Sequence, residues 1–426
     1  MTKPVIVIGA GIAGLATAYR LAERRVPAAV FEATDVVGGR MATLRSNGFS
    51  VDSGADGLLD GYRATWSLLT ELGLRTEVVS LRTPTAGVWR AGRIHVAPSS
   101  LFGAPMFTGL STSTKLGSVR LAPAVLRPAR FDQVTVADMV REVGGRAAEE
   151  LLNYGVEPAI RGLFGWDVEQ SSAGMVLRIL GAARGRIRLR TYRDGMDTLA
   201  RELARRTDVR LGAAVREVRP DGAGVAVVTQ DGVMHPAPAC VLAVPAPIAV
   251  RLTAGCDVHP FVAAATYTKV ACVDAYLDRP MPPPGVYGVT FPSVDEPVLG
   301  WAAFESAKPG RTPVNAQVVR LAATGAFGAS FADDPELAHD TLLARAAEYF
   351  PGLLESVVRT RPHYFPHGLP EARADAQPLF TSFQSRPHGP VEFAGDWTSI
   401  PCSEGAVRSA VSAADRVAEW VGRSSS

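Results

Sequence analysis

A glycine-rich hexapeptide near the start of the chain can bind a phosphate through its backbone. It has the pattern GxGxxG over 9–14, and the residues expected to contact the phosphate are Gly9, Gly11, Ile12, Ala13 and Gly14. The β-branched run 5–8 precedes it, and apolar residues at helical spacing follow over 12–24. A turn of this kind, between a strand and a helix, brings a pyrophosphate against the free N–H groups of the helix.

A carboxylate at the end of the next predicted strand, 28–32, extends this pattern. Glu32 follows Gly14 by 18 residues. At this place a carboxylate accepts hydrogen bonds from both ribose hydroxyls of a dinucleotide, and it favours a free 2′-hydroxyl over a 2′-phosphate. The alternative interpretation is a glycine-rich turn beside a surface glutamate with no role in binding. That interpretation does not explain why a strand, a turn, a helix, a second strand and an acid follow one another at the spacing of the dinucleotide fingerprint.

FAD and NAD share this fingerprint, and the residues that follow Glu32 distinguish them. Two glycines permit a close backbone approach, and the arginine after them can place a cation near a diphosphate. This GGR element resembles the one that follows the ribose acid in the amine oxidase, protoporphyrinogen oxidase and phytoene desaturase superfamily. The turn at 52–55 is similar to the superfamily element that lies beside the flavin. The alternative is that it is a generic turn with no role in binding. The residues concerned are Gly38, Gly39, Arg40 and Met41, then Gly54 and Ala55 in the turn 52–55.

A second match to the superfamily lies near the C-terminus. Residues 393–397 resemble the flavoprotein AGD strand, and 403–409 resemble the helix whose N-terminus points at the isoalloxazine. The resemblance implies that Asp396 binds the ribityl chain or a diphosphate-bound water. The helix start would stabilise the negative charge that develops at N1 and the C2 carbonyl on flavin reduction. A buried capped helix is the alternative. The residues implied here are Gly395, Asp396, Ser403, Glu404, Gly405, Ala406 and Val407.

Outside these two ends the resemblance is weaker. Val215 lies in a segment similar to the strand whose backbone meets the adenine, and 241–245 resembles a strand that borders the flavin. Amine oxidases of the superfamily often carry a lysine that is water-linked to flavin N5, and Lys269 is the candidate. The superfamily pattern would place Cys272 nearer the lysine position, so a solvated strand lysine is the other interpretation.

Two histidines and a basic stretch have no assigned chemistry. His363 and His367 have no recognisable partner and are expected to be packing or surface residues. No residue from 78 to 131 is acidic, although the stretch carries basic side chains. This bias is compatible with an anionic substrate, with a membrane surface, or with a solvated basic face, which is the favoured interpretation.

The composition bounds the possible functions. The chain has 426 residues, 47% of them hydrophobic, and a formal net charge of +2. This weak charge argues against binding to nucleic acid. The four cysteines have no metal or disulfide spacing, which fits the cytoplasm. No apolar stretch is long enough to predict a spanning helix. Arginine outnumbers lysine 40 to 4, as is typical of GC-rich bacterial coding.

These observations predict an α/β fold in two domains. A Rossmann-like FAD-binding domain, with a parallel sheet in ββα layers, is expected over 1–60, 190–250 and 386–426. A mixed α+β substrate domain over 61–189 and 251–385 interrupts it. Helical segments are expected at 64–72, 136–143 and 335–349, and strands at 269–277 and 317–323.

The predicted function is that of an FAD-dependent oxidase or dehydrogenase. A hydride would pass from a substrate C–H, in an amine CH–NH or a CH–CH group, to flavin N5, and O2 would reoxidise the flavin. The substrate is expected to be a small organic molecule. Non-covalent FAD is expected, because no cysteine lies between Cys272 and Cys402. A redox-neutral isomerase or mutase is the alternative enzyme, and a protein that retains FAD structurally is the non-enzymatic alternative.

Overall fold

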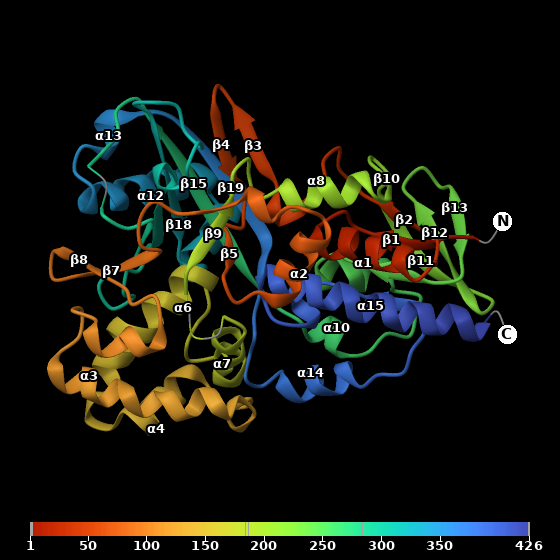
Figure 1. Ribbon diagram of the computed structural model, residues 1–426, viewed down its shortest axis with the longest axis horizontal. Coiled ribbons are helices and arrows are strands. Elements are labelled where there is room, and N and C mark those ends of the chain that lie inside the picture. The colour runs from red at the N-terminus through yellow and green to blue at the C-terminus, as the bar shows by residue number, and fades with distance from the viewer. Residues whose placement is uncertain (1–2, 184, 186, 283, 425–426) are drawn as a thin grey trace.

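A parallel five-stranded sheet forms the part of the molecule that carries both chain ends (Figure 1). The computed structural model describes residues 3–424 except 184, 186 and 283. The strand order is β10-β2-β1-β14-β20. These strands are β1 (Val5–Ile8), β2 (Ala28–Phe31), β10 (Asp208–Arg210), β14 (Cys240–Leu242) and β20 (Val391–Phe393).

The predicted strand, glycine turn, helix and strand at the N-terminus are confirmed. Helix α1 (Ile12–Glu23) connects β1 to β2, which pair in parallel. All four residues of β1 are buried, as expected for a parallel strand covered on both faces.

The faces of the parallel sheet are covered differently. The side chains of Val5, Val7 and Val30 share one core with α1, α8 (Thr198–Arg205) and α15 (Ser403–Ser424). On the other face, Ile6, Ile8 and Phe31 pack against an antiparallel three-stranded sheet. That sheet consists of β11 (Val215–Asp221), β12 (Gly224–Thr229) and β13 (Met234–Ala237). The antiparallel sheet, the parallel sheet and the helices thus form three successive layers.

A second, seven-stranded sheet has the order β19-β15-β18-β17-β16-β7-β8. Its neighbours pair antiparallel except β16 and β7, which are parallel. Helix α12 (Pro335–Tyr349) packs on this sheet. The predicted strands at 269–277 and 317–323 and the predicted helix at 335–349 are confirmed. The strands are β7 (Ala86–Arg90), β8 (Arg93–Val96), β15 (Tyr267–Leu277), β16 (Gly288–Thr290), β17 (Leu299–Phe304), β18 (Gln317–Ala323) and β19 (Val357–Pro370).

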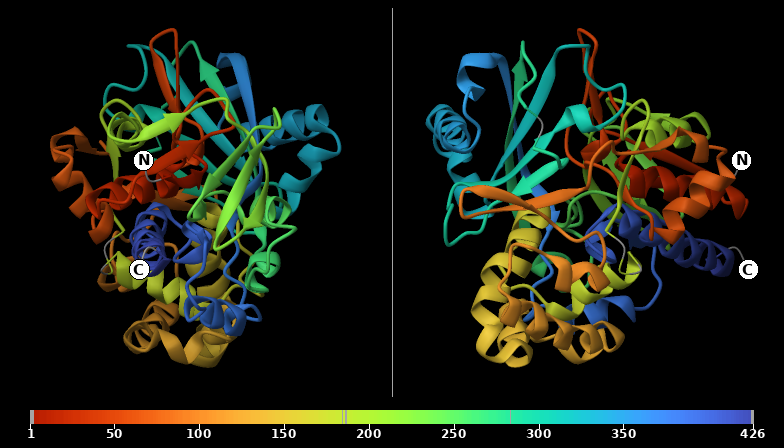
Figure 2. Two further views of the ribbon diagram at one scale, coloured as in Figure 1. Left: turned by 90° about the vertical axis from the view of Figure 1, so that its right-hand side faces the viewer. Right: turned by 60° about the vertical axis from the view of Figure 1, so that its left-hand side comes forward.

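A helical segment between β8 and β9 has its own core and lies below the second sheet in both views of Figure 2. It contains the predicted helix at 136–143. Its elements are η3 (Leu101–Met106), α3 (Thr112–Ser118), η4 (Val119–Leu126), η5 (Pro128–Phe131), α4 (Val136–Gly144), η6 (Gly145–Ala147), α5 (Ala148–Leu151), the π-helix η7 (Leu152–Val156), α6 (Glu157–Phe164) and α7 (Ala173–Ala182).

Short elements join these parts. The helices are η1 (Gly39–Met41), α2 (Arg63–Glu71), η2 (Arg75–Glu77), α9 (Ala246–Leu252), α10 (Phe261–Ala264), η8 (Glu305–Ala307), α11 (Gly325–Gly328), η9 (Ala329–Ala332), α13 (Leu353–Ser356), α14 (Gln377–Gln384) and η10 (Asp396–Thr398). The strands are β3 (Thr43–Ser46) and β4 (Phe49–Asp52), which form a hairpin, and β5 (Leu58–Leu59), β6 (Val78–Ser80) and β9 (Leu189–Tyr192), which form a small sheet. Among the described residues no helix has both the length and the apolar character needed to cross a bilayer.

Candidate functional site

The glycine turn after β1 has the shape of a phosphate cradle. A Cβ at Gly14 would lie 1.9 Å from the carbonyl oxygen of Gly9, so α1 packs directly on the turn. A Cβ at Gly11 would meet nothing within 4 Å, so the turn is open on that side. Gly9 has φ +104°, which favours glycine. Ile12 and Ala13 begin α1, whose first N–H groups have no partner within the helix.

Glu32 lies beside this turn, as the sequence predicted. Its Oε2 accepts a hydrogen bond from the backbone N–H of Ala10 at 2.7 Å. Its Oε1 accepts hydrogen bonds from the backbone N–H of Thr34 at 3.0 Å and from the Thr34 hydroxyl at 2.9 Å. The backbone carbonyl of Glu32 accepts a hydrogen bond from Ala213, which leads into the strand that carries Val215. The proposed ribose acid is therefore fixed next to the proposed phosphate cradle.

The GGR element packs on the same turn. The N–H of Gly38 donates to the carbonyl of Ala10 at 2.9 Å, and a Cβ on Gly39 would lie 3.5 Å from the Cα of Gly11. Met41 is buried behind it. The turn that contains Gly54 and Ala55 contacts the GGR element. The carbonyl of Arg40 accepts the N–H of Ala55 at 2.8 Å and would lie 2.5 Å from a Cβ on Gly54.

An ion pair joins the two ends of the chain at this place. Arg40 Nη2 lies 2.8 Å from Asp396 Oδ1, and Arg40 Nη1 donates to the carbonyl of Gly368 at 2.7 Å. Burial alone would lower the pKa of Arg40, but Asp396 outweighs it and the pKa is raised above its usual value. The guanidinium thus stays charged beside the glycine turn.

Helix α15 begins at Ser403, within the segment where the sequence placed it. A Cβ at Gly405 would lie 1.8 Å from the carbonyl oxygen of Ile400, so the helix start packs tightly on the preceding loop. The buried Ser409 hydroxyl accepts the N–H of Gly395 at 2.9 Å. Ala406 and Val407 are buried in the first two turns. The helix start is therefore held to the loop that carries Asp396.

The side chain of Glu404 has a structural partner elsewhere. Its carboxylate accepts the backbone N–H groups of Ala64 and Thr65 at 2.9 Å each, and so caps helix α2. Because both carboxylate oxygens are used in this way, only the backbone N–H of Glu404 is left to contact a flavin. Next to it lies Cys402, and burial raises the pKa of its thiol to about 11.

The proposed catalytic lysine, Lys269, is exposed on β15 at an irregularity in its pairing with β19. The structure does not bring its side chain together with the other predicted site residues. Cys272, further along the same strand, is buried, and burial raises the pKa of its thiol to about 12.

Sequence reasoning missed a fully buried lysine that packs beside the proposed flavin turn. Lys308 Nζ lies 3.0 Å from Asp52, 3.1 Å from Glu305 and 3.6 Å from Asp56. Burial alone would lower the pKa of Lys308, but Glu305 and Asp52 outweigh it and raise that pKa. Lys308 is followed by Pro309 and Gly310, a sequence typical of an exposed turn. No sequence signal therefore indicates that this lysine is buried.

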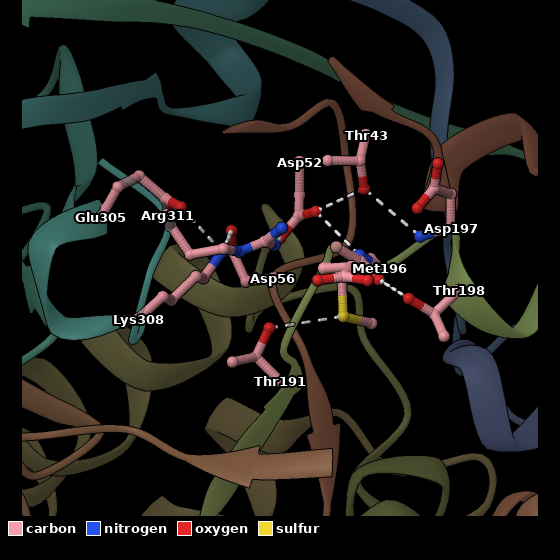
Figure 3. Close-up of polar contacts among 12 residues, drawn as sticks. Thr43, Asp52, Asp56, Thr191, Met196, Asp197, Thr198, Glu305, Lys308 and Arg311 are labelled. Carbon is pink, nitrogen blue, oxygen red and sulfur yellow. Dashed lines mark hydrogen bonds and ion pairs between the residues drawn. The ribbon is translucent and has the colours of Figure 1, made fainter. Parts of the chain in front are cut away.

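Asp52 is the centre of this buried cluster (Figure 3). Its Oδ1 accepts the Thr43 hydroxyl at 2.7 Å and the Met196 N–H at 2.9 Å, while Oδ2 faces Lys308 and Arg311. Burial opposes its ionisation, yet Lys308 and Arg311 hold the pKa of Asp52 well below its usual range. The cluster fixes the strand before the Gly54 turn to the loop between β17 and β18.

A second buried pair continues from this cluster across the seven-stranded sheet. Arg320 bonds both carboxylate oxygens of Asp274, at 2.8 and 3.0 Å, and lies 3.7 Å from Asp56. His363 Nε2 lies 2.8 Å from Asp274 Oδ2. The sequence showed no partner for His363. Strand β19 places it opposite Cys272 on β15, and from there its ring reaches Asp274, 89 residues away in the chain.

A model of the flavin-containing amine oxidoreductase family matches residues 12–418. The chain belongs to this family. The family cofactor fits the cradle at Gly11, the acid at Glu32 and the Arg40–Asp396 pair, and FAD is accordingly the cofactor of the chain.

Three individual proteins that the chain resembles share no more than 27% sequence identity with it. The chain is 27% identical over 183 residues to coproporphyrinogen III oxidase of Staphylococcus aureus, a match that covers 40% of this chain and 38% of that enzyme. Cyclohexylamine oxidase of Brevibacterium oxydans has a similar fold, with a TM-score of 0.78, 20% identity and coverage of 99% and 100% of the two chains. A fatty acid isomerase from P. acnes also shares the fold, with a TM-score of 0.74, 16% identity and coverage of 97% and 98%.

Proposed function

We propose that this chain transfers a hydride from a substrate C–H group to flavin N5 and is reoxidised by O2. The observation that carries the proposal is the pairing of Arg40 with Asp396, residues 356 positions apart, beside the glycine cradle. It supports one dinucleotide site assembled from both ends of the chain. When bound, FAD supplies the hydride acceptor.

The side chains and backbone of the site have separate roles in this proposal. Glu32 binds the ribose, and the turn at Gly11 with the start of α1 binds the diphosphate. Arg40 neutralises phosphate charge, and Asp396 holds Arg40 in place. The first turn of α15 stabilises the negative charge that develops during reduction, because its N–H groups are the positive end of a 22-residue helix.

We propose Lys269 as the lysine to test at flavin N5, with Lys308 as the other candidate. Lys269 is the candidate from the sequence, but its exposure favours a solvated lysine. Lys308 is buried and packs beside the Gly54 turn. If Lys269 acts at N5, Lys269→Met slows anaerobic flavin reduction and leaves stability unchanged. An unchanged reduction rate in that variant removes Lys269 from the mechanism.

The substrate is proposed to be a small organic molecule with an oxidisable CH–NH or CH–CH group. The relatives are named for a porphyrinogen and for a primary amine on a cyclohexane ring, so both classes belong in a substrate screen. We propose the cytoplasm as the compartment, because all four cysteines are free thiols.

Anaerobic incubation with each candidate substrate tests the proposal. An oxidase or dehydrogenase loses its yellow flavin absorbance in proportion to the substrate added, and air restores the colour if O2 is the acceptor. Turnover without net loss of absorbance would establish a redox-neutral isomerase instead. A flavin spectrum that neither substrates nor dithionite change would indicate a structural cofactor.

A further inference from the structure

One acid of the buried cluster around Lys308 is open to solvent. The side chain of Asp56 is 26% exposed, whereas the side chains of Asp52, Glu305 and Lys308 are 0% exposed. Arg320, the other cation that faces Asp56, is 4% exposed. A molecule that reaches this cluster from solvent therefore meets the carboxylate of Asp56 and not the buried cations behind it.

Asp56 is held by two cations whose shortest contacts are with other acids. Lys308 Nζ lies 3.6 Å from Asp56 Oδ1 but within 3.1 Å of two other carboxylates (Figure 3). Arg320 Nη1 lies 3.7 Å from the same oxygen, while its Nε and Nη2 bond the buried acid of β15 at 2.8 and 3.0 Å. The nearby Tyr287 hydroxyl donates to Glu305 at 3.1 Å.

The hydrogen-bonding capacity of Asp56 is therefore not used within the protein. Its Oδ1 is buried and has no hydrogen bond to any described residue. Most buried polar atoms in proteins have such a partner, and one that lacks it calls for an explanation. The two cations fix the position of the Asp56 carboxylate and leave it able to accept a hydrogen bond from a ligand on its exposed side.

Asp56 lies where the elements of the cofactor site meet the second sheet. It directly follows the turn 52–55, which contacts the GGR element. Val319 and Leu321 of β18 share a core with α12, so Arg320 between them projects from the opposite face of the sheet, toward Asp56. Ligand sites form preferentially where two such parts of a chain meet.

We propose that Asp56 is a specificity-determining residue that selects substrates by their charge. Its carboxylate accepts a hydrogen bond from a cationic N–H group of the substrate and repels a carboxylate in the same place. Because Lys308 and Arg320 already fix Asp56, little ordering of this side chain opposes binding. The inference rests on the proposed function, since it places the substrate beside the turn that we assign to the flavin.

Two probes of similar shape and opposite charge test the proposal on the FAD-loaded, oxidised protein. They are the α,α-dimethylbenzylammonium cation and the α,α-dimethylphenylacetate anion. Neither has a C–H on the carbon that bears the charged group, so neither can be oxidised there, and binding is followed as a change in flavin absorbance. A hydrogen bond to a charged group contributes about 10- to 100-fold in affinity, so the wild type should bind the cation at least about tenfold more tightly than the anion.

Two neutral variants and a matched control assign that preference to one side chain. Asp56→Asn and Asp56→Ser each remove the charge, and the ratio of the two affinities should fall to near unity. Asp60→Asn is the control, because Asp60 is 27% exposed and is bonded by Arg190 at 2.7 and 3.2 Å. It changes the net charge equally and should keep the preference. Circular dichroism and the flavin content verify that each variant is folded and holds FAD.

Several results would overturn the proposal. The wild type could bind the two probes equally, prefer the anion or fail to bind the cation, or a folded neutral variant of Asp56 could keep the wild-type preference. Anaerobic flavin reduction is read separately. A charge preference in a protein that no substrate reduces would refute hydride transfer but not the role of Asp56, whereas reduction without a charge preference would do the reverse.

Discussion

Replacing Lys308 by methionine removes the cation at the centre of the buried cluster while keeping a side chain of similar length. The lysine side chain is 0% exposed, and its Nζ lies within 3.1 Å of both Asp52 and Glu305. Methionine offers neither charge nor hydrogen bond. The two carboxylates therefore remain in a buried site with one cation fewer.

The expected loss of stability follows from what remains around the carboxylates. Removing one partner of a buried ion pair costs about 3–5 kcal/mol, because the other charge is left uncompensated. Asp52 keeps Arg311 and two further hydrogen bonds, and burial already raises the pKa of Glu305, so this carboxyl can take up a proton. We therefore expect the lower end of that range, about 3 kcal/mol at neutral pH. The loss should grow as the pH rises above the already raised pKa of Glu305 in the wild type, because the variant must then keep a proton on Glu305 or bury its charge without Lys308, while the unfolded chain is ionised.

Urea unfolding of the FAD-saturated proteins, followed by circular dichroism, measures this loss. Lys269→Met is the matched control, because that lysine is exposed and its replacement should change the free energy of unfolding by less than about 0.5 kcal/mol. Equal unfolding midpoints for the two methionine variants would show that Lys308 is not buried among carboxylates, and the description of the cluster would be wrong.

Three further predictions concern the cofactor and the second buried pair. Glu32→Ala should weaken FAD retention, measured as flavin lost on gel filtration, and unchanged retention would remove Glu32 from the ribose site. Acid precipitation should release all flavin into the supernatant, whereas a yellow washed pellet would show covalent attachment. Burial opposes the ionisation of Asp274, but Arg320 and His363 lower its pKa from 3.8 to about 2. The stability that this ionised carboxylate contributes, about 2 kcal/mol, is present above about pH 4 and is lost as the pH falls through about 2. Acid unfolding should show this loss in the wild type but not in Asp274→Asn, and identical pH profiles would contradict it.

Local patterns made the cofactor half of the fold predictable. The alternation of β-branched runs, glycines and a helical period over residues 5–31 determines a strand, turn, helix and strand without help from distant residues. The contact of Glu32 with Ala10 follows from that unit, because parallel strands end at the same edge of a sheet.

Contacts between distant segments were not predictable in the same way. The pairing of Arg40 with Asp396 depends on how β20 joins the sheet, and the sequence indicated only that both residues belong to flavin elements. The Glu404 carboxylate caps a helix 340 residues away, which no local pattern indicates. The burial of Lys308 likewise depends on Asp52, which comes from a strand 256 residues earlier.

The domain boundaries and the site residues remain predictions of this account. The parallel sheet takes its strands from 5–31, 208–242 and 391–393, which lie within the expected cofactor stretches. The seven-stranded sheet takes its strands from 86–96 and 267–370, within the expected substrate stretches.

Calorimetric titration of the flavin-free protein with FAD and with FMN tests the central claim most directly. A dinucleotide site built by Gly11, Glu32, Arg40 and Asp396 binds one FAD per chain and binds FMN far more weakly. FMN lacks the AMP half of FAD, and with it both the ribose that Glu32 would hold and the second phosphate of the diphosphate that the glycine turn would bind. Arg40→Ala should reduce the affinity for FAD. Equal affinity for FAD and FMN, or an Arg40→Ala variant that binds FAD as tightly as the parent, would contradict the site described here.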